Sequence, residues 1–189
     1  MPLTPASITG LVTVNLLATG NLGTKVPQLA AGVAAGVMLW NASLKVVTID
    51  AGTLGVGVGL LPCVIPQPLL LASFLGGLAA TGNVGVMMPL LALGLANGLA
   101  LSFATGVITT THPTVGTGTG VARFNGGSAV PGMIGGFASV GMVGPGPTKI
   151  ATGIGVGLDT AFAAFTVPIP IVGPPSPAAS GGTGFGTIV

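Results

Sequence analysis

The stretch LLATGNLG at Leu16–Gly23 returns as LAATGNVG at Leu78–Gly85. The likeness extends downstream, because more than half of the positions in Leu16–Leu39 are identical in Leu78–Leu101 without a gap. Self-similarity at a fixed spacing is the signature of a chain built from repeated structural units. The shared Thr-Gly-Asn and Pro residues are not explained by an abundance of Gly, Ala and Leu. The sequence therefore predicts an internal repeat.

A third copy follows, since FLGGLAATGNVG at Phe74–Gly85 aligns with MIGGFASVGMVG at Met133–Gly144. The chain of 189 residues thus divides into three units of about 60 residues each. We place these units at 1–68, 69–130 and 131–189, within one compact body. Three copies on one chain predict a pseudo-threefold arrangement, which can match one unit to each subunit of a trimer.

Every unit repeats the same order of elements. A short apolar segment ends at a glycine stop, because Gly just past a helix accepts the left-handed conformation cheaply. A second segment begins near Pro27 or Pro89, which suit the first helical turn, and it carries glycines four residues apart. A β-branched run then predicts a strand, and alternating glycines close the unit. The predicted fold class is α+β: a short helix, a Gly stop, a Gly-rich helix, a β-strand and a Gly-rich strand or loop in each unit. The positions expected to carry this repeated structure are Gly20, Asn21, Gly23, Pro27, Gly32, Gly36, Gly82, Asn83, Gly85, Pro89, Gly94, Gly98, Gly141, Gly144, Gly153 and Gly157.

The composition predicts that most of the surface is covered. Charged residues make up 3% of the chain, against about 25% in a typical soluble domain, and the mean hydropathy is +0.98. A free globule needs a charged surface to avoid association. The formal net charge of +2 comes from only four basic residues and two acidic ones, which are too few for the clustered Lys and Arg of a nucleic-acid-binding surface.

Lipid or protein can cover such a surface, and the sequence leaves both open. The clearest candidate for a membrane span is Val84–Ile108, and small residues four apart are a common packing pattern of transmembrane helices. However, Lys45 and Asp159 interrupt the equivalent segments of the other units. The first apolar segment of each unit is also too short to cross about 30 Å of hydrocarbon. We predict burial by protein, with a small integral membrane protein (a pore, transporter-like or holin-like protein) as the alternative.

The inventory of reactive side chains is poor. The chain has one histidine, His112, and one cysteine, Cys63, and its two acids are Asp50 and Asp159. A metal site needs three or four ligands, and a reactive thiol needs a basic neighbour that Cys63 lacks in the sequence. We therefore expect no catalytic, metal-binding or cofactor-binding residue, and no enzymatic activity.

In having three corresponding units in one chain, the protein resembles the PAAR-type tip proteins of contractile phage tails. The zinc-binding histidine and cysteine set of that family is missing, since only His112 and Cys63 are present. The resemblance implies a structural virion protein in the hub, baseplate or spike tip of a bacteriophage tail. Its partners would be other subunits of the assembly, in a trimeric spike or hub, and its apolar body could also contact the host membrane.

Overall fold

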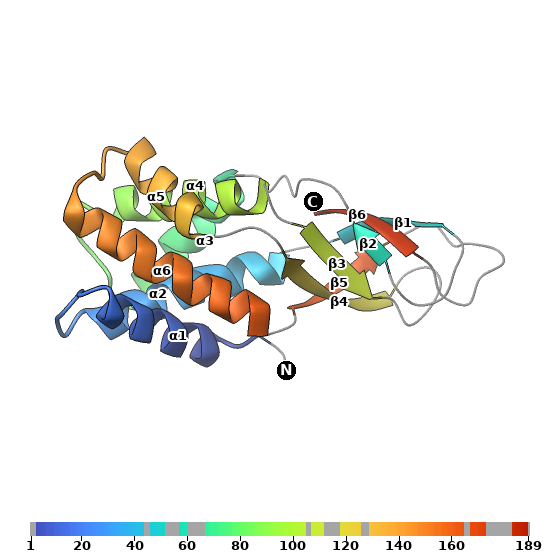
Figure 1. The fold of residues 1–189 in the computed structure, drawn as a ribbon, viewed down its shortest axis with the longest axis horizontal. Helices are drawn as coiled ribbons and strands as arrows, with labels where there is room; N and C mark the ends of the chain where they lie inside the picture. The colour runs from blue at the N-terminus through green and yellow to red at the C-terminus, as the bar shows by residue number, and fades with distance from the viewer. Residues whose placement is uncertain are drawn as a thin grey trace.

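The computed structural model describes side chains in residues 3–42, 67–102 and 129–164, and backbone alone at Ser43, at 103–104 and in short strands. Six helices occupy these residues: α1 (Pro5–Ala18), α2 (Val26–Ser43), α3 (Gln67–Ala80), α4 (Met88–Ala104), α5 (Ala129–Ser139) and α6 (Pro145–Ala164). They form three helical hairpins, α1–α2, α3–α4 and α5–α6. The three hairpin loops lie together at one end of the helical body, on the left in Figure 1.

The three hairpin loops share one backbone conformation. In the first loop, the N–H of Gly20 donates to the carbonyl of Leu17 and the N–H of Asn21 donates to the carbonyl of Leu16, both at 3.0 Å. The same two bonds recur in the other loops and constitute the Schellman motif that ends a helix. A glycine with positive φ stands at the equivalent position of each loop: Gly20 (82°), Gly82 (76°) and Gly141 (78°).

This helix stop can be tested at Gly141, where an added Cβ would meet no atom within 4 Å. We expect Gly141→Ala to lower the free energy of unfolding by about 1–2 kcal/mol, because an L-residue is strained in the left-handed conformation. Gly141→Asn should cost less, since Asn tolerates that conformation. Urea unfolding followed by helical circular dichroism measures the effect. The control is Gly10→Ala, because an added Cβ there also meets no atom within 4 Å. Gly10 lies in the middle of α1, so this substitution should stabilise the protein. If Gly10→Ala lowered the free energy of unfolding as much as Gly141→Ala, the backbone conformation of Gly141 would not explain the loss.

The six helices form a closed ring. Each helix packs against its neighbours in chain order, and α6 packs against α1, so that the last helix meets the first (Figure 1). Contacts within a hairpin alternate around the ring with contacts between hairpins. The latter join the second helix of one hairpin to the first helix of the next: α2 to α3, α4 to α5 and α6 to α1. The proposed division at 68/69 and 130/131 falls in the first turns of α3 and α5 and stays a prediction.

Glycines bring the helix backbones together at all three interfaces between hairpins. At each interface a glycine of the second helix faces one residue of the next hairpin: Gly36 faces Phe74, Gly98 faces Met133 and Gly157 faces Val12. A Cβ added to these glycines would lie 3.0, 2.8 and 2.7 Å from the Cα of the facing residue. The pairs occupy corresponding places in the three units, so the interfaces share one register. Only glycine permits so close a backbone approach.

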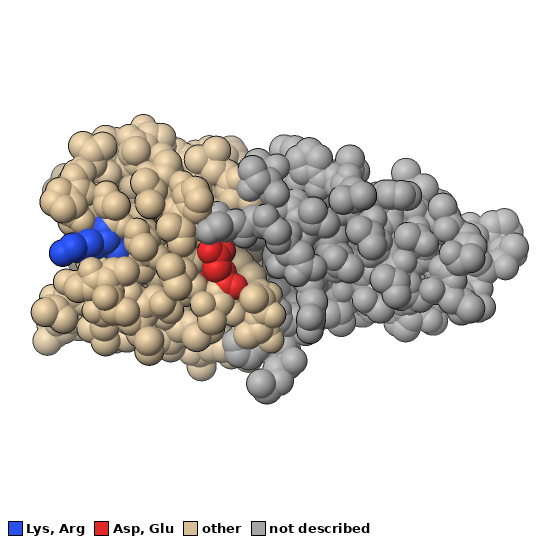
Figure 2. Space-filling view, viewed as in Figure 1, with Lys and Arg blue, Asp and Glu red and all other residues tan. Residues whose placement is uncertain are grey.

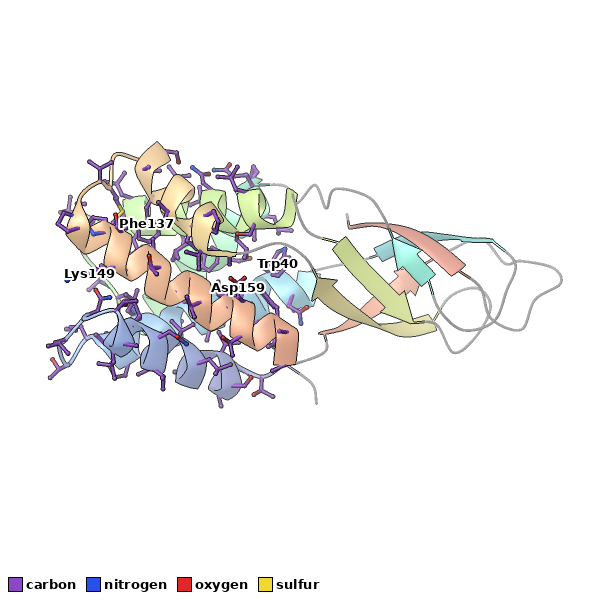
Figure 3. The ribbon with its side chains drawn as sticks, viewed as in Figure 1. Trp40, Phe137, Lys149 and Asp159 are labelled. Atoms are coloured by element: carbon purple, nitrogen blue, oxygen red, sulfur yellow. The ribbon has the colours of Figure 1, made fainter. Side chains whose placement is uncertain are left out.

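The core is built in layers of corresponding residues. Both the second helices and the first helices contribute buried layers. From the second helices come Ala30, Ala92 and Ala151; Val33, Leu95 and Ile154; and Val37, Leu99 and Leu158. From the first helices come Ile8, Leu70 and Ala129; Val12, Phe74 and Met133; and Leu16, Leu78 and Phe137. In a further layer the large Trp40 is matched by the small Ser102 and Ala161, all three buried (Trp40 and Phe137 are labelled in Figure 3). A large side chain in one unit is thus accompanied by small side chains at the corresponding positions of the other two units.

Short strands follow the second helix of every hairpin. Their bounds are β1 (Val46–Ala51), β2 (Gly57–Gly59), β3 (Val107–Thr111), β4 (Gly118–Asn125), β5 (Val167–Val172) and β6 (Thr183–Ile188). They pair with one another in the order β2-β3-β4-β5-β1-β6 and lie beyond the end of the helices opposite to the loops (Figure 1).

The predicted α+β class is wrong for the body that carries the core. The part of the chain with described side chains is all-helical, with six helices and no strand, and its buried residues belong to the helices, apart from Leu3, which lies two residues before α1. The physical reason is ring closure. Each glycine-lined helix buries its apolar face against the first helix of the next hairpin, so no strand is needed to cover it.

The sequence alternative of an integral membrane protein names one candidate span, which can be compared with the helices. Among the described residues, no helix combines the length and the apolar character that crossing a bilayer requires. The candidate span Val84–Ile108 is divided in the structure, because α4 covers only Met88–Ala104 and the residues before it form the hairpin loop.

Candidate functional site

The loop end of the ring carries the most distinctive surface of the described residues. Leu22, Val84 and Val143 occupy corresponding places in the three loops and are 84%, 80% and 70% exposed. Val86 and Met87 of the second loop are exposed beside them. Large apolar side chains held open to solvent at one end of a body mark an interaction surface. We call this end, with its three loops, the loop face.

The loop face is hollowed at its centre. Two adjoining hollows of about 470 and 360 Å³ share the lining residues Leu29, Leu91 and Ile150. These three side chains come from α2, α4 and α6 and correspond in the repeat, which places the hollow on the pseudo-threefold axis. Lys25 and Asn83 line both hollows as well. The hollow is therefore a socket lined mainly by apolar side chains, with Lys25 and Asn83 as polar members of its lining.

Hydrogen bonds hold the frame of this socket. The side-chain amide of Asn83 donates to the carbonyl of Gln28 at 3.0 Å and to the hydroxyl of Thr81 at 2.8 Å. Gln28 in turn donates from Nε2 to the carbonyl of Thr81 at 2.9 Å. These bonds tie the second loop to α2 of the preceding hairpin. In the first loop, Asn21 bonds within its own loop, to the Leu16 carbonyl and the Thr19 hydroxyl.

Charge is distributed unevenly along the helical body. Lys25 and Lys149 are both exposed at the loop face, and a Cβ added to Gly20 would lie 3.7 Å from the Nζ of Lys149. Figure 2 shows lysine at the loop end and the acid towards the opposite end of the described helices, and Figure 3 labels Lys149 and Asp159 there. Asp159 is the only acid among residues with described side chains. The loop face is thus apolar with a positive edge.

Asp159 has a structural role at the other end. Its Oδ1 accepts a hydrogen bond from the N–H of Ala129 at 2.6 Å, at the start of α5. A carboxylate stabilises a helix N-terminus through the unpaired N–H groups and the helix dipole. This helix-capping position explains a charge in the middle of an otherwise apolar segment.

We expect Asp159→Ala to lower the free energy of unfolding by about 1–2 kcal/mol, because a helix-capping acceptor is lost. Asp159→Asn, which retains an acceptor oxygen, should lose less. Guanidinium unfolding of the full chain measures both variants. An Asn variant as unstable as the Ala variant would show that the hydrogen bond at Ala129 is not the source of the effect.

The other sequence-predicted positions are placed as follows. The glycine stops Gly20, Gly82 and Gly141 and the loop glycines Gly23, Gly85 and Gly144 all have positive φ. Pro27 and Pro89 lie in the first turns of α2 and α4. The glycines at the interfaces between hairpins are Gly32, Gly36, Gly94, Gly98, Gly153 and Gly157. Asn21 and Asn83 lie at the hollow.

Of the reactive residues singled out from the sequence, Asp159 is the one whose side chain the structure describes. His112 and Cys63 lie outside the described residues, and of Asp50 only the backbone, in β1, is described. Among the described residues, no group of three or more His, Cys, Asp or Glu side chains is arranged to hold a metal ion.

Two sets of residues escaped the sequence reasoning. The exposed trio Leu22, Val84 and Val143 and the socket trio Leu29, Leu91 and Ile150 occupy columns of the repeat that stay apolar in all three units. An apolar column inside a loop is the signal that could have identified the first trio.

Comparison with protein-family models, with curated proteins and with solved structures found no match to this chain.

Proposed function

We propose that this protein is a non-enzymatic structural component of a large assembly, seated on the axis of a threefold-symmetric partner. The observation that carries the proposal is the closed ring of three corresponding hairpins, with one register at every interface. A single chain with this pseudo-symmetry can face three identical subunits in the same way. The hub or spike tip of a phage tail, which the resemblance implies, is an assembly of this kind.

The outer surface of the ring supports the same proposal. Large apolar side chains are exposed on the helices as well as on the loop face: Val14 (64%), Leu17 (46%), Leu39 (50%), Leu90 (38%), Leu101 (50%) and Ile134 (37%). A body with so few charged residues and so many exposed apolar ones associates in water. If neighbouring subunits cover these residues, the helical body is held in the assembly and does not associate non-specifically.

The proposal is tested by counting copies in the native assembly. The full chain, tagged at one end and produced in its source cell, is isolated with the particle that contains it. Absolute quantification by mass spectrometry should give one copy of this chain for three copies of the subunit that contacts it. A reconstruction of the particle without imposed symmetry should place the chain on a threefold axis. Equal copy numbers, or a position away from any axis, would overturn the proposal.

A further inference from the structure

We infer that the loop face is the docking surface, and that its socket receives an apolar projection from the axis of a homotrimeric protein partner bearing carboxylates beside it. This inference rests on the proposed function and deepens it, because it assigns one end of the ring to the partner and states the chemistry of that partner.

The first argument is the equivalence of the three loops. Leu22, Val84 and Val143 stand at the same position of the repeat, and each presents an aliphatic side chain that is at least 70% exposed. A homotrimer offers three identical surfaces around its axis. Each of the three side chains can then meet the same site on a different subunit, with no unpartnered position left over.

The second argument is the shape of the surface. The socket is concave and lined by one aliphatic residue from each second helix: Leu29, Leu91 and Ile150. Its rim is held by the glycine-ended loops and by the bonds of Asn83 to Gln28 and Thr81. A preformed apolar concavity favours binding of a rigid projecting group, because neither side loses much conformational entropy when the two associate. Apolar side chains converging on the axis of a trimer form such a projection.

The third argument is charge. Lys25 and Lys149 stand at the edge of the loop face, and the acid Asp159 lies towards the other end of the described helices. If a second copy of this chain docked through its own loop face, it would bring two more lysines to the interface and, from the described residues, no carboxylate. A second copy is therefore a poor electrostatic match. Complementary charge across an interface favours the correct partner and disfavours wrong ones. The partner is therefore expected to carry Asp or Glu near its axis.

The decisive experiment uses a photo-cross-linking amino acid placed at position 22, 84 or 143 of the full chain, within the native assembly. Because three corresponding side chains face three identical subunits, all three positions should capture the same peptide of the same partner protein. Val14 on the outer face of α1, which is 64% exposed, is the matched control position, and it should capture a different peptide or none.

Substitutions complete the test. Leu22→Asp, Val84→Asp and Val143→Asp should each reduce incorporation into the assembly about tenfold or more, because a charge is buried against an apolar site. Their unfolding midpoints should match wild type, since the side chains are exposed. Val14→Asp, on the outer surface of the ring and away from the loops, should leave capture of the partner peptide at positions 22, 84 and 143 unchanged. The double variant Lys25→Glu, Lys149→Glu should also reduce incorporation, and more strongly at low salt.

The outcomes separate the two proposals. Three different peptides, or no capture, with the copy ratio of one to three intact, would overturn the docking surface and leave the proposed function standing. A failed copy ratio would overturn the proposed function itself. Binding to vesicles of phosphatidylglycerol and phosphatidylcholine tests whether lipid, and not a protein, covers the loop face. If wild type binds them, Leu22→Asp does not, and no partner peptide is captured, the loop face contacts lipid and the inference is wrong.

Discussion

Gly136→Ala is expected to destabilise the helical ring by about 3 kcal/mol or more, because it forces atoms into a space already filled by backbone. A Cβ on Gly136 would collide with the backbone N of Gly98 and lie 2.6 Å from its Cα. Gly77→Ala should behave in the same way, since its Cβ would collide with the backbone N of Gly36 at the preceding interface. A side chain can change its rotamer to relieve a collision, but backbone atoms cannot. The two helices of each interface must therefore move apart.

The neighbouring glycines supply the matched controls. A Cβ on Gly135 would lie 3.5 Å from Leu101 Cδ1, and one on Gly76 would lie 3.4 Å from Leu39 Cδ1, which are ordinary contacts. Gly135→Ala and Gly76→Ala should therefore stabilise the protein by about 0.5–1 kcal/mol, through helix propensity. Thermal and urea unfolding of the four variants measures the contrast. Similar stabilities for Gly135→Ala and Gly136→Ala would show that the helices do not cross as closely as the structure has them.

Phe137→Ala is expected to cost about 3–5 kcal/mol, because the ring is 1% exposed and its removal leaves a cavity in the core. Phe137 lies against Gly94 of α4, where an added Cβ would stand 2.9 Å from the Phe137 Cδ1 atom. Gly94→Ala should therefore be destabilising in the wild-type protein. In the Phe137→Ala background the same change should cost little or nothing, because the ring atoms that it would strike are gone.

A double-mutant cycle in urea measures this coupling, which we expect at about 1–3 kcal/mol in favour of the double variant. The control pairs Phe137→Ala with Gly10→Ala, a glycine with no atom near its Cβ position; those two changes should be additive. If Gly94→Ala were equally costly in both backgrounds, the contact between α4 and α5 would not be limited by the Phe137 ring.

Some of the structure follows from particular residues in the repeat. Thr-Gly-Asn at Thr19–Asn21 recurs because a helix must end there, and a glycine with positive φ does stand at that place in all three loops. Pro27 and Pro89 suit a helix start, and α2 and α4 begin beside them. A helix stop or start depends on the backbone preferences of a few consecutive residues, so a single stretch of sequence can indicate it.

Other predictions failed where distant segments decide. The glycines of α2, α4 and α6 fitted a lipid-embedded helix as well as a packed one, and the β-branched runs suggested that strands would share the core. Which helix faces Gly36 or Gly157 cannot be read from its own segment, because Phe74 and Val12 lie in other hairpins. The same holds for Gly77 and Gly136, whose closest neighbours, Gly36 and Gly98, lie on other helices.

The sequence by itself determined the threefold repeat, the helix stops and the small-residue faces, because each depends on local backbone preference or on residue spacing within one segment. Only the tertiary structure decided that α6 returns to α1, that helices alone enclose the described core, and that three apolar side chains gather around one socket. The physical reason is that ring closure and the socket arise from contacts between residues far apart in the chain, where packing and not local propensity selects the arrangement.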